Sequence, residues 1–226
     1  MYKNIKILGV ESVKKFSIFA LIATLIVSIT VLVPISTAAS LPFTDIKSTN
    51  QELYNAVTEF YNDDVVFGVT STAYKPSQKA TRGETAQFIV NALGWKDENA
   101  TNPGFKDTAS SKYKDAIHIL ANKGIVNVSE KFNPNGNLTR AQVAKMIVLA
   151  YELELSTKTT TKFTDVNKIK DTSTKQYIAT LVDYEITTGT TAKTFSPNNQ
   201  VTRAQLTLFL YRGLEHVGEF EIISVE

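Results

Sequence analysis

Apolar residues recur at helical spacing in three pairs of segments along the 226-residue chain. The first segment of each pair has apolar side chains at i, i+3 and i+4, which predicts an amphipathic helix. These positions are Leu53, Val57, Phe60 and Tyr61; Ala116, Ile117, Leu120 and Ala121; and Ile178, Leu181 and Val182. The second segment carries a wider apolar stripe. Its positions are Phe88, Ile89, Ala92 and Leu93; Val143, Met146, Ile147, Ala150 and Tyr151; and Leu206, Phe209, Leu210, Gly213 and Leu214.

A threonine marks the start of each second helix. Thr81, Thr139 and Thr202 each have Glu or Gln three residues later, which is the pattern of a capping box. An aromatic-x-Pro turn stands seven residues before each of these threonines, counted from its aromatic residue, and a loop that contains glycine comes before the turn. The turns are Tyr74-Lys-Pro76, Phe132-Asn-Pro134 and Phe195-Ser-Pro197.

The same order of elements occurs three times, and each copy opens with Phe-x-Asp. The openers are Phe43-Thr-Asp45, Phe105-Lys-Asp107 and Phe163-Thr-Asp165, at separations of 62 and 58 residues. A unit of this length is too short to bury a good core alone, so the copies are expected to share one. The sequence therefore predicts a mostly α fold of three helix-loop-helix repeats with one core in a pseudo-threefold arrangement. The repeats span 40–98, 99–158 and 159–218, and a short tail follows at 219–226.

Residues 1–39 have the pattern of a secretory signal peptide. Lysines precede an uncharged apolar run over residues 16–35, and small residues follow it. This pattern predicts cleavage near Ala38 or Ala39. The apolar run is also about long enough to cross a bilayer, so an uncleaved membrane anchor stays open as the alternative.

The charge balance changes once the leader is set aside. The full sequence has 24 basic and 22 acidic side chains, and residues 1–39 hold four lysines and one glutamate, so 20 and 21 remain. A near-neutral chain without a Lys/Arg cluster has no electrostatic footprint for nucleic acid. The lack of cysteine excludes thiol catalysis and cysteine-ligated metal. No nucleophile elbow, phosphate loop or dinucleotide fingerprint occurs, so we expect neither an enzyme nor a cofactor.

Each repeat contains Phe-x-Asp, a helix, a Gly-containing loop, an aromatic-x-Pro turn and Thr-Arg-x-Glu/Gln. This order, in triplicate behind a leader, resembles the S-layer homology (SLH) domain family. The resemblance covers residues 43–216. It implies a three-lobed helical domain that binds a secondary cell wall polysaccharide without a covalent bond, often a glycan with pyruvylated sugars. It further implies a place at the cell wall, in or near a surface layer (S-layer), and no enzymatic activity.

Two features depart from the family pattern. The family usually carries a Trp in the first helix, and by register those places hold Glu52, Lys112 and Ser173. Tyrosines lie nearby at positions 54, 113 and 177. The glycine pair of the loop is also incomplete, since its members are replaced by Asp64, Val128 and Glu185 in one copy each. Not every groove between repeats need be a competent site.

The arginine of Thr-Arg-x-Glu/Gln is not explained by helix capping. Arg82, Arg140 and Arg203 stand at the first helical position, where the helix dipole gives a cation no gain. One interpretation is anion binding, because helix N-terminal amides and a forked guanidinium form a pocket for a carboxylate such as a pyruvate ketal. The other is structural: each guanidinium pairs with an opener aspartate and locks the repeats together.

Further candidate ligand contacts come from the same motifs. The opener aspartates would accept hydrogen bonds from sugar hydroxyls, and loop glycines would let the backbone approach a sugar ring. Turn chemistry is the alternative for the glycines, and capping alone accounts for the motif Glu and Gln. No metal site and no catalytic residue are expected. The candidate ligand-binding residues are Arg82, Arg140, Arg203, Asp45, Asp107, Asp165, Gly68, Gly189, Glu84, Gln142 and Gln205.

The sequence thus predicts a secreted anchor that binds an anionic cell wall polysaccharide in grooves between repeats. The alternative is a structural scaffold at the cell surface with degraded glycan sites, tethered to the membrane if the leader is retained. Contacts with surface-layer proteins fit either hypothesis. A nucleic acid partner is not expected, and a membrane is a partner only if the leader is uncleaved.

Overall fold

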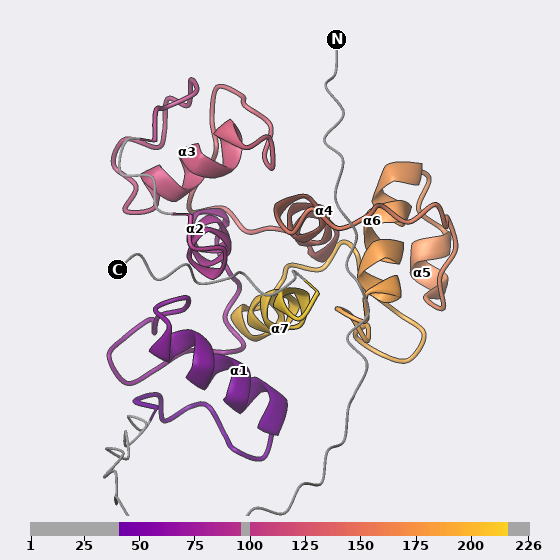
Figure 1. The fold of residues 1–226 in the computed structure, drawn as a ribbon, viewed down its shortest axis with the longest axis horizontal. Coiled ribbons are helices and arrows are strands. Elements are labelled where there is room, and N and C mark those ends of the chain that lie inside the picture. The colour runs from indigo at the N-terminus through magenta and orange to yellow at the C-terminus, as the bar shows by residue number, and fades with distance from the viewer. Residues whose placement is uncertain (1–40, 96–99, 217–226) are drawn as a thin grey trace, which may run out of the picture. The chain divides into compact units, whose positions relative to one another are not determined.

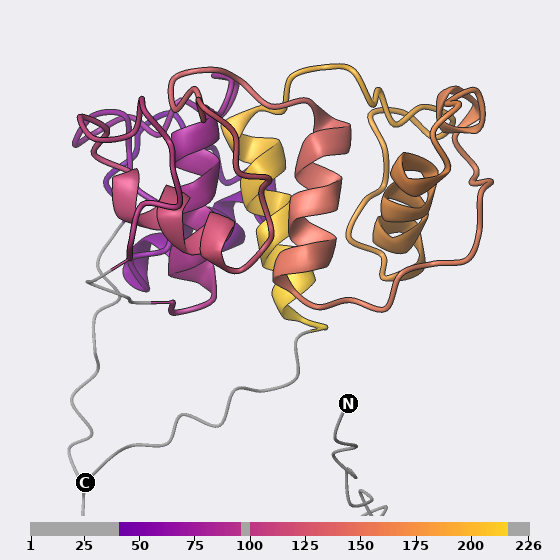
Figure 2. The same cartoon turned by 90° about the horizontal axis from the view of Figure 1, so that it is seen from above.

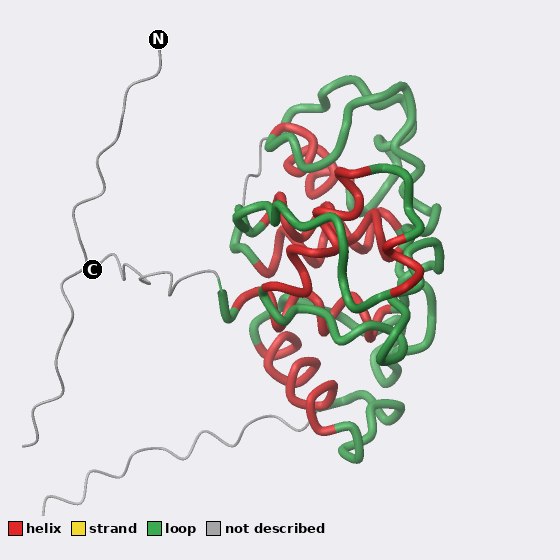
Figure 3. Tube along the Cα trace, turned by 90° about the vertical axis from the view of Figure 1, so that its right-hand side faces the viewer, coloured by secondary structure: helices red, strands yellow, loops and turns green. Residues whose placement is uncertain are grey.

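The computed structural model describes residues 41–95 and 100–216, and the predicted leader and tail lie outside these ranges. Within them the chain forms helices joined by loops, with no strand (Figure 1; Figure 3). None of these helices is long and apolar enough to span a bilayer. The helices are α1 (Gln51–Asn62), α2 (Arg82–Ala92), α3 (Lys114–Asn122), α4 (Arg140–Ala150), α5 (Thr164–Asn167), α6 (Thr172–Asp183) and α7 (Arg203–Leu214).

The predicted helix pairs are confirmed. Helices α1, α3 and α6 are the first helices of the three repeats, and α2, α4 and α7 are the second. All three second helices start with the predicted capping box: Thr81 Oγ1 accepts from the Glu84 amide at 3.1 Å, and Glu84 accepts from the Thr81 amide at 3.2 Å. The two threonines at equivalent positions make the same pair of bonds with Gln142 and Gln205. Helix α5 was not predicted, because four residues show no periodicity.

The second helices occupy the centre of the three-repeat body. Helix α7 contacts both α2 and α4, and the three lie side by side (Figure 2). Each second helix packs against the first helix of the next repeat: α2 against α3, α4 against α6, and α7 against α1 (Figure 1). The last repeat therefore packs back onto the first. The pseudo-threefold arrangement with a shared core, which the repeat spacing predicted, is confirmed.

One cluster of buried apolar side chains runs through all three repeats. The predicted stripes form its centre, but the second helices bury more than a stripe. Ala86 and Val90 of α2 are buried as well, as are Ala144 and Val148 of α4. These helices have neighbours on several sides, so one apolar face does not describe them. The opener phenylalanines 43, 105 and 163 are buried in the same cluster.

Candidate functional site

The opener aspartate of each repeat holds the aromatic-x-Pro turn of the same repeat. Asp107 Oδ1 accepts from the Phe132 amide and Oδ2 from the Asn133 amide, each at 2.8 Å. Asp45 and Asp165 make the same two contacts with their own turns. The residue before the proline has a positive φ in every copy, a conformation that costs energy and that the carboxylate contacts hold in place. These residues are Lys75, Asn133 and Ser196, with φ of 56°, 59° and 59°.

Two of these aspartates ionise more easily than usual. Partial burial opposes ionisation of Asp107 and Asp165, but the turn amides that donate to each carboxylate outweigh it and lower the pKa of both side chains. The aspartates are therefore anionic near neutral pH. Their first task in the structure is to fix a turn, and acceptance of a sugar hydroxyl would come in addition to it.

The first two amides of each second helix donate to carbonyls of the next repeat. The Arg82 amide donates to Gly136 O at 2.7 Å, and the Gly83 amide to Pro134 O at 2.9 Å. The first amides of α4 and α7 repeat this pattern on the turns of the third and first repeats. The capping threonine takes the third amide. The amides that would form an anion pocket at these helix ends therefore already donate hydrogen bonds to oxygen atoms of the protein.

The motif arginines reach across the same junctions. Arg203 is 0% exposed: its Nε donates to Tyr74 O at 2.8 Å, Nη1 pairs with Glu84, and Nη2 donates to Phe67 O. The guanidinium also stands 4.4 Å above the Tyr74 ring. Arg203 in the third repeat therefore clamps the turn and the second helix of the first repeat.

The other two arginines bind their neighbouring repeats less completely. Arg140 is 2% exposed and donates from Nε to Phe195 O at 2.7 Å, and Arg82 donates to Phe132 O at 2.6 Å. Each guanidinium lies 4.5 Å above the ring of its phenylalanine. Arg140 Nη2 is buried without a partner, and burial lowers the pKa of this arginine to about 10.

This geometry favours the structural interpretation of the arginines over anion binding. The partners differ from those the sequence suggested: they are turn carbonyls and Glu84, and no ion pair joins a motif arginine to an opener aspartate within the described ranges. The stability of the three-repeat body therefore depends on these side chains. A ligand-binding role for the arginines stays a prediction, as it does for Gln142 and Gln205, which cap their own helices.

The loop glycines face protein atoms. A Cβ at Gly68 would collide with Thr70 O and with the Phe43 ring, and one at Gly189, where φ is +88°, would collide with Phe163. Each of these glycines lets its loop lie against the opener phenylalanine of its own repeat. Close approach to a sugar at Gly68 and Gly189 stays a prediction.

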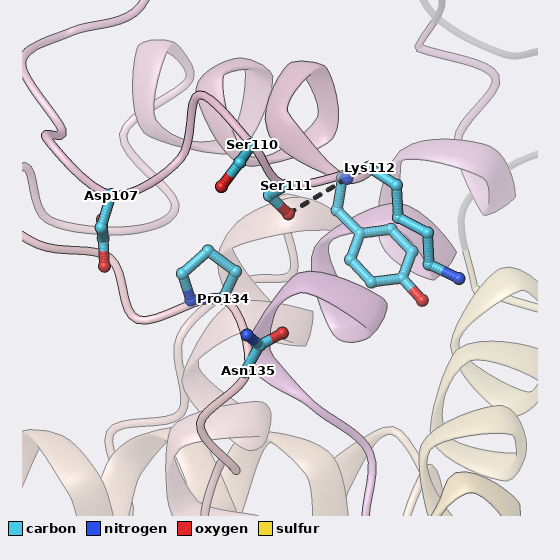
Figure 4. Close-up of a pocket in the computed structure, with 7 residues that line it drawn as sticks. Asp107, Ser110, Ser111, Lys112, Pro134 and Asn135 are labelled. Carbon is cyan, nitrogen blue, oxygen red and sulfur yellow. Dashed lines mark hydrogen bonds between the residues drawn. The ribbon is translucent and has the colours of Figure 1, made fainter.

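Two cavities adjoin at the junction of α2 and α3. One, of about 360 Å³, is lined by Phe67, Gln87, Asn91, Lys112 and Tyr113. The other, of about 370 Å³, shares Lys112 and Tyr113 and reaches Asp107 (Figure 4). Both volumes fall in the range of small-molecule sites, about 300–1,000 Å³. Figure 4 shows the Lys112 side chain extending away from Asp107, with Pro134 and Asn135 below.

Tyr113 forms the wall between these cavities because α2 has a glycine beside it. A Cβ on Gly83 would lie 2.5 Å from Cδ2 of Tyr113, so the ring can rest on α2 only at a glycine. Tyr113 also stacks on Phe67, with ring centroids 6.2 Å apart and planes 18° from parallel. Burial raises the pKa of the Tyr113 hydroxyl, which stays protonated.

The two other junctions differ at the positions that match Asn91 and Lys112. At the junction of α4 and α6 they are Leu149 and Ser173. At the junction of α7 and α1 they are Arg212 and Glu52, which form a two-pronged ion pair with bonds of 2.6 and 2.8 Å. A further cavity of about 450 Å³ in the third repeat is lined by Asp165, Lys168 and residues 196–199. It corresponds to the Asp107 cavity of the second repeat.

Of the predicted ligand contacts, only Asp107 and Asp165 line these cavities. Lys112 and Tyr113 were noted in the sequence only as a departure from the family pattern, and Gln87 and Asn91 were missed. A signal was present: Gly83 stands where the other two motifs have alanine, and Tyr113 follows Lys112 directly. Sequence alone does not show that α2 faces α3. In the described part of the chain, no three metal-ligating side chains gather.

The family model named S-layer homology domain matches the chain at residues 42–86, 104–144 and 162–207, one segment in each repeat. These segments cover more than half of the sequence, and the chain belongs to the S-layer homology domain family. Domains of this family anchor proteins to the cell wall, which implies a partner in the wall and a place at the cell surface.

The curated relatives include surface-layer proteins and enzymes. The chain is 31% identical over 206 residues to a "Surface-layer 125 kDa protein" of Lysinibacillus sphaericus, covering 88% of the chain and 17% of that protein. It is 27% identical over 192 residues to an "S-layer protein" of Bacillus thuringiensis subsp. finitimus (84% and 23%). An "Endoglucanase" of Bacillus sp. (strain KSM-635) is 30% identical over 213 residues (87% and 22%).

The chain spans about a fifth of the length of these relatives. The same stretch is shared by proteins with enzyme names and proteins with surface-layer names, so it is tied to neither activity. Only S-layer homology domains are found in the chain, and no catalytic domain is shown.

Proposed function

We propose that the chain anchors itself at the cell surface by binding an anionic secondary cell wall polysaccharide, without a covalent bond, in the grooves between its repeats. The observation that carries this proposal is the pair of adjoining cavities at the junction of α2 and α3. They contain what a glycan site needs: an aromatic wall, side-chain amides and a carboxylate that can accept from hydroxyls.

Binding would use these groups in distinct ways. The apolar face of a sugar ring rests on the Phe67–Tyr113 stack, where burial of apolar surface contributes to affinity. Gln87 and Asn91 offer amide groups along α2, and Asp107 offers lone pairs beyond its two turn contacts. The motif arginines act indirectly, because they hold together the repeats that form the walls of the groove.

A structural scaffold is the second candidate. The observation that favours it is the Arg212–Glu52 ion pair, which joins two protein groups where a ligand would lie at the junction of α7 and α1. Under this hypothesis the repeats serve protein contacts within a surface layer, and the glycan affinity is lost.

Sedimentation of the purified protein with cell walls tests the proposal. Walls from a Bacillus strain with an S-layer serve before and after acid extraction of the secondary polymer. We expect the protein to pellet with intact walls and to stay in the supernatant with extracted ones. Equal pelleting with both would mean that the polymer is not the partner. No pelleting with either, by a protein with a normal melting transition, would favour the scaffold.

A further inference from the structure

We propose that Lys112 is the residue of this chain that recognises the acid group of the glycan, and that it does so in the groove between α2 and α3. This inference rests on the proposed function. The motif arginines, the anion contacts suggested by the sequence, bind neighbouring repeats. Lys112 is instead an exposed cation at the cavity wall.

The position of Lys112 suits a ligand contact. Its side chain is exposed and lines both cavities of the junction. The ammonium nitrogen lies 5.4 Å from the centre of the Phe67 ring and 4.8 Å from that of Tyr113. The aromatic faces attract the cation and hold it beside the surface on which a sugar would rest. An acid substituent on that sugar then meets the ammonium without a large movement of the side chain.

The charges around Lys112 leave it available. Among the described residues, no carboxylate lies within 4 Å of its ammonium group. Asp107 on the far wall of the second cavity accepts two backbone amides. Glu84, the acidic residue of the adjacent helix start, is paired with Arg203. An anion that enters the groove therefore meets a positive charge that no protein group has neutralised.

Neutral groups beside Lys112 are already oriented. Gln87 Nε2 donates to Asn91 Oδ1 at 2.8 Å, and Asn91 Nδ2 donates to Asp64 O at 3.0 Å. This short chain of hydrogen bonds fixes both amides along the groove. Ordered polar groups next to an exposed cation fit a sugar that carries one charged substituent.

Among the described residues, no cation of the other two junctions is both unpaired and placed over the aromatic wall of a cavity. Lys168 lines the Asp165 cavity, but no aromatic side chain lines it with Lys168. Arg212 is held by both oxygens of Glu52 and donates a further bond to Ile186 O. Lys145, on α4, lies 6.0 Å from the Tyr177 ring, and its charge contributes to lowering the pKa of Asp171 after the two Thr174 contacts. Arg212 is thus neutralised by Glu52, and Lys145 lines none of the cavities described above. We therefore assign acid recognition to one groove of the three.

The inference is tested with a small probe rather than with whole walls. The probe is a hexose glycoside that carries a pyruvate ketal, and its neutral analogue has a methyl group in place of the carboxylate. Dissociation constants for both are measured by calorimetry on the full protein and on Lys112→Met. Lys114→Met, at the first residue of α3, and Lys145→Met are the matched controls. Melting temperatures confirm that all variants are folded.

A charge-assisted contact corresponds to a factor of roughly ten or more in affinity. We expect the unmodified protein and both controls to prefer the acidic probe by about that factor, and Lys112→Met to bind the two probes equally. Retention of the preference by Lys112→Met would overturn the inference. So would its loss in Lys145→Met, which would place recognition at the next junction.

Failure of this inference can be told apart from failure of the proposed function. If the protein pellets with intact walls but not with extracted walls, the proposed function stands whatever Lys112→Met does. If the protein pellets with neither and binds neither probe, both ideas fail together.

Discussion

The guanidinium of Arg203 and the carboxylate of Glu84 form a buried ion pair that joins the third repeat to the first. The two residues are 119 positions apart. Glu84 uses its other oxygen to cap its own helix at the Thr81 amide. One side chain thus completes a helix start and neutralises the arginine of another repeat.

Glu84→Gln is expected to destabilise the protein by about 3 kcal/mol, because a buried cation loses its counter-ion. Glutamine keeps the capping function, as Gln142 and Gln205 do in the other two repeats. The change therefore isolates the ion pair from the cap. The free energy of unfolding from urea titration is the measurement. A loss below about 0.5 kcal/mol would show that the pair contributes little.

Gln205→Glu is the complementary change, and it is expected to stabilise the protein by about 1.5 kcal/mol. Arg140 donates from Nε to a carbonyl of the third repeat, as Arg203 does to a carbonyl of the first. Nη2 of Arg140, however, has no partner. The residue that matches Glu84 at that junction is Gln205, whose oxygen is used at the Thr202 amide. A carboxylate there would give the buried Arg140 guanidinium a counter-ion, as Glu84 does at Nη1 of Arg203. Urea titration again measures the effect, with Gln142→Glu at the third junction for comparison.

Arg140→Ala and Thr139→Ala separate clamping from capping. Loss of the Thr139 cap is expected to cost about 1 kcal/mol. Loss of Arg140 also removes its bond to Phe195 O and the packing on that ring, so we expect a larger loss of stability. The helix dipole considered alone leads to the opposite expectation, since a cation gains nothing at a helix start. Melting temperatures that stay unchanged in Arg140→Ala would restore that view.

The sequence specified the helices far better than the contacts between repeats. The capping boxes at Thr81, Thr139 and Thr202 marked three helix starts correctly, because a cap depends on residues only three apart. The role of Arg203 depends on Tyr74 and Glu84, more than a hundred residues away. Nothing in the local spacing shows that a second helix packs against the next repeat rather than its own.

The candidate site was predicted unevenly for the same reason. Asp107 lines a cavity, and its turn contacts are internal to one repeat, but its role as a ligand contact stays a prediction. Lys112 and Gln87 meet only through the packing of α2 on α3. The substitution of Trp by Lys112 was visible, but its meaning depended on which helix it faced.

Asp165→Asn is expected to weaken the dependence of stability on acid. Because the folded protein lowers the pKa of Asp165 below the ordinary value of 3.8, the carboxylate stabilises the fold above that pH. This contribution is lost as the pH falls through 3.8 and lower. The variant should be less stable than the unmodified protein at pH 7 and lose less between pH 7 and pH 3. Urea midpoints at both pH values measure this, with the exposed Asp63→Asn as control.

Gly83→Ala tests the fit between α2 and the Tyr113 ring. Alanine normally stabilises a helix relative to glycine by about 1 kcal/mol. Here we expect destabilisation, because the new methyl group would meet the ring. In a Tyr113→Ala background the same change should become favourable. A double-mutant cycle on the free energy of unfolding gives the coupling, and additive effects would argue against the contact.

The packing of α7 on α1 also affects how the protein folds. Arg212 and Glu52 are 160 positions apart, so α1 of the first repeat is covered by α7 of the third. Contacts between such distant partners slow folding, because the intervening chain must first close into a loop. For a chain predicted to be exported, slow closure would keep the first repeat open to threading until the third repeat follows it.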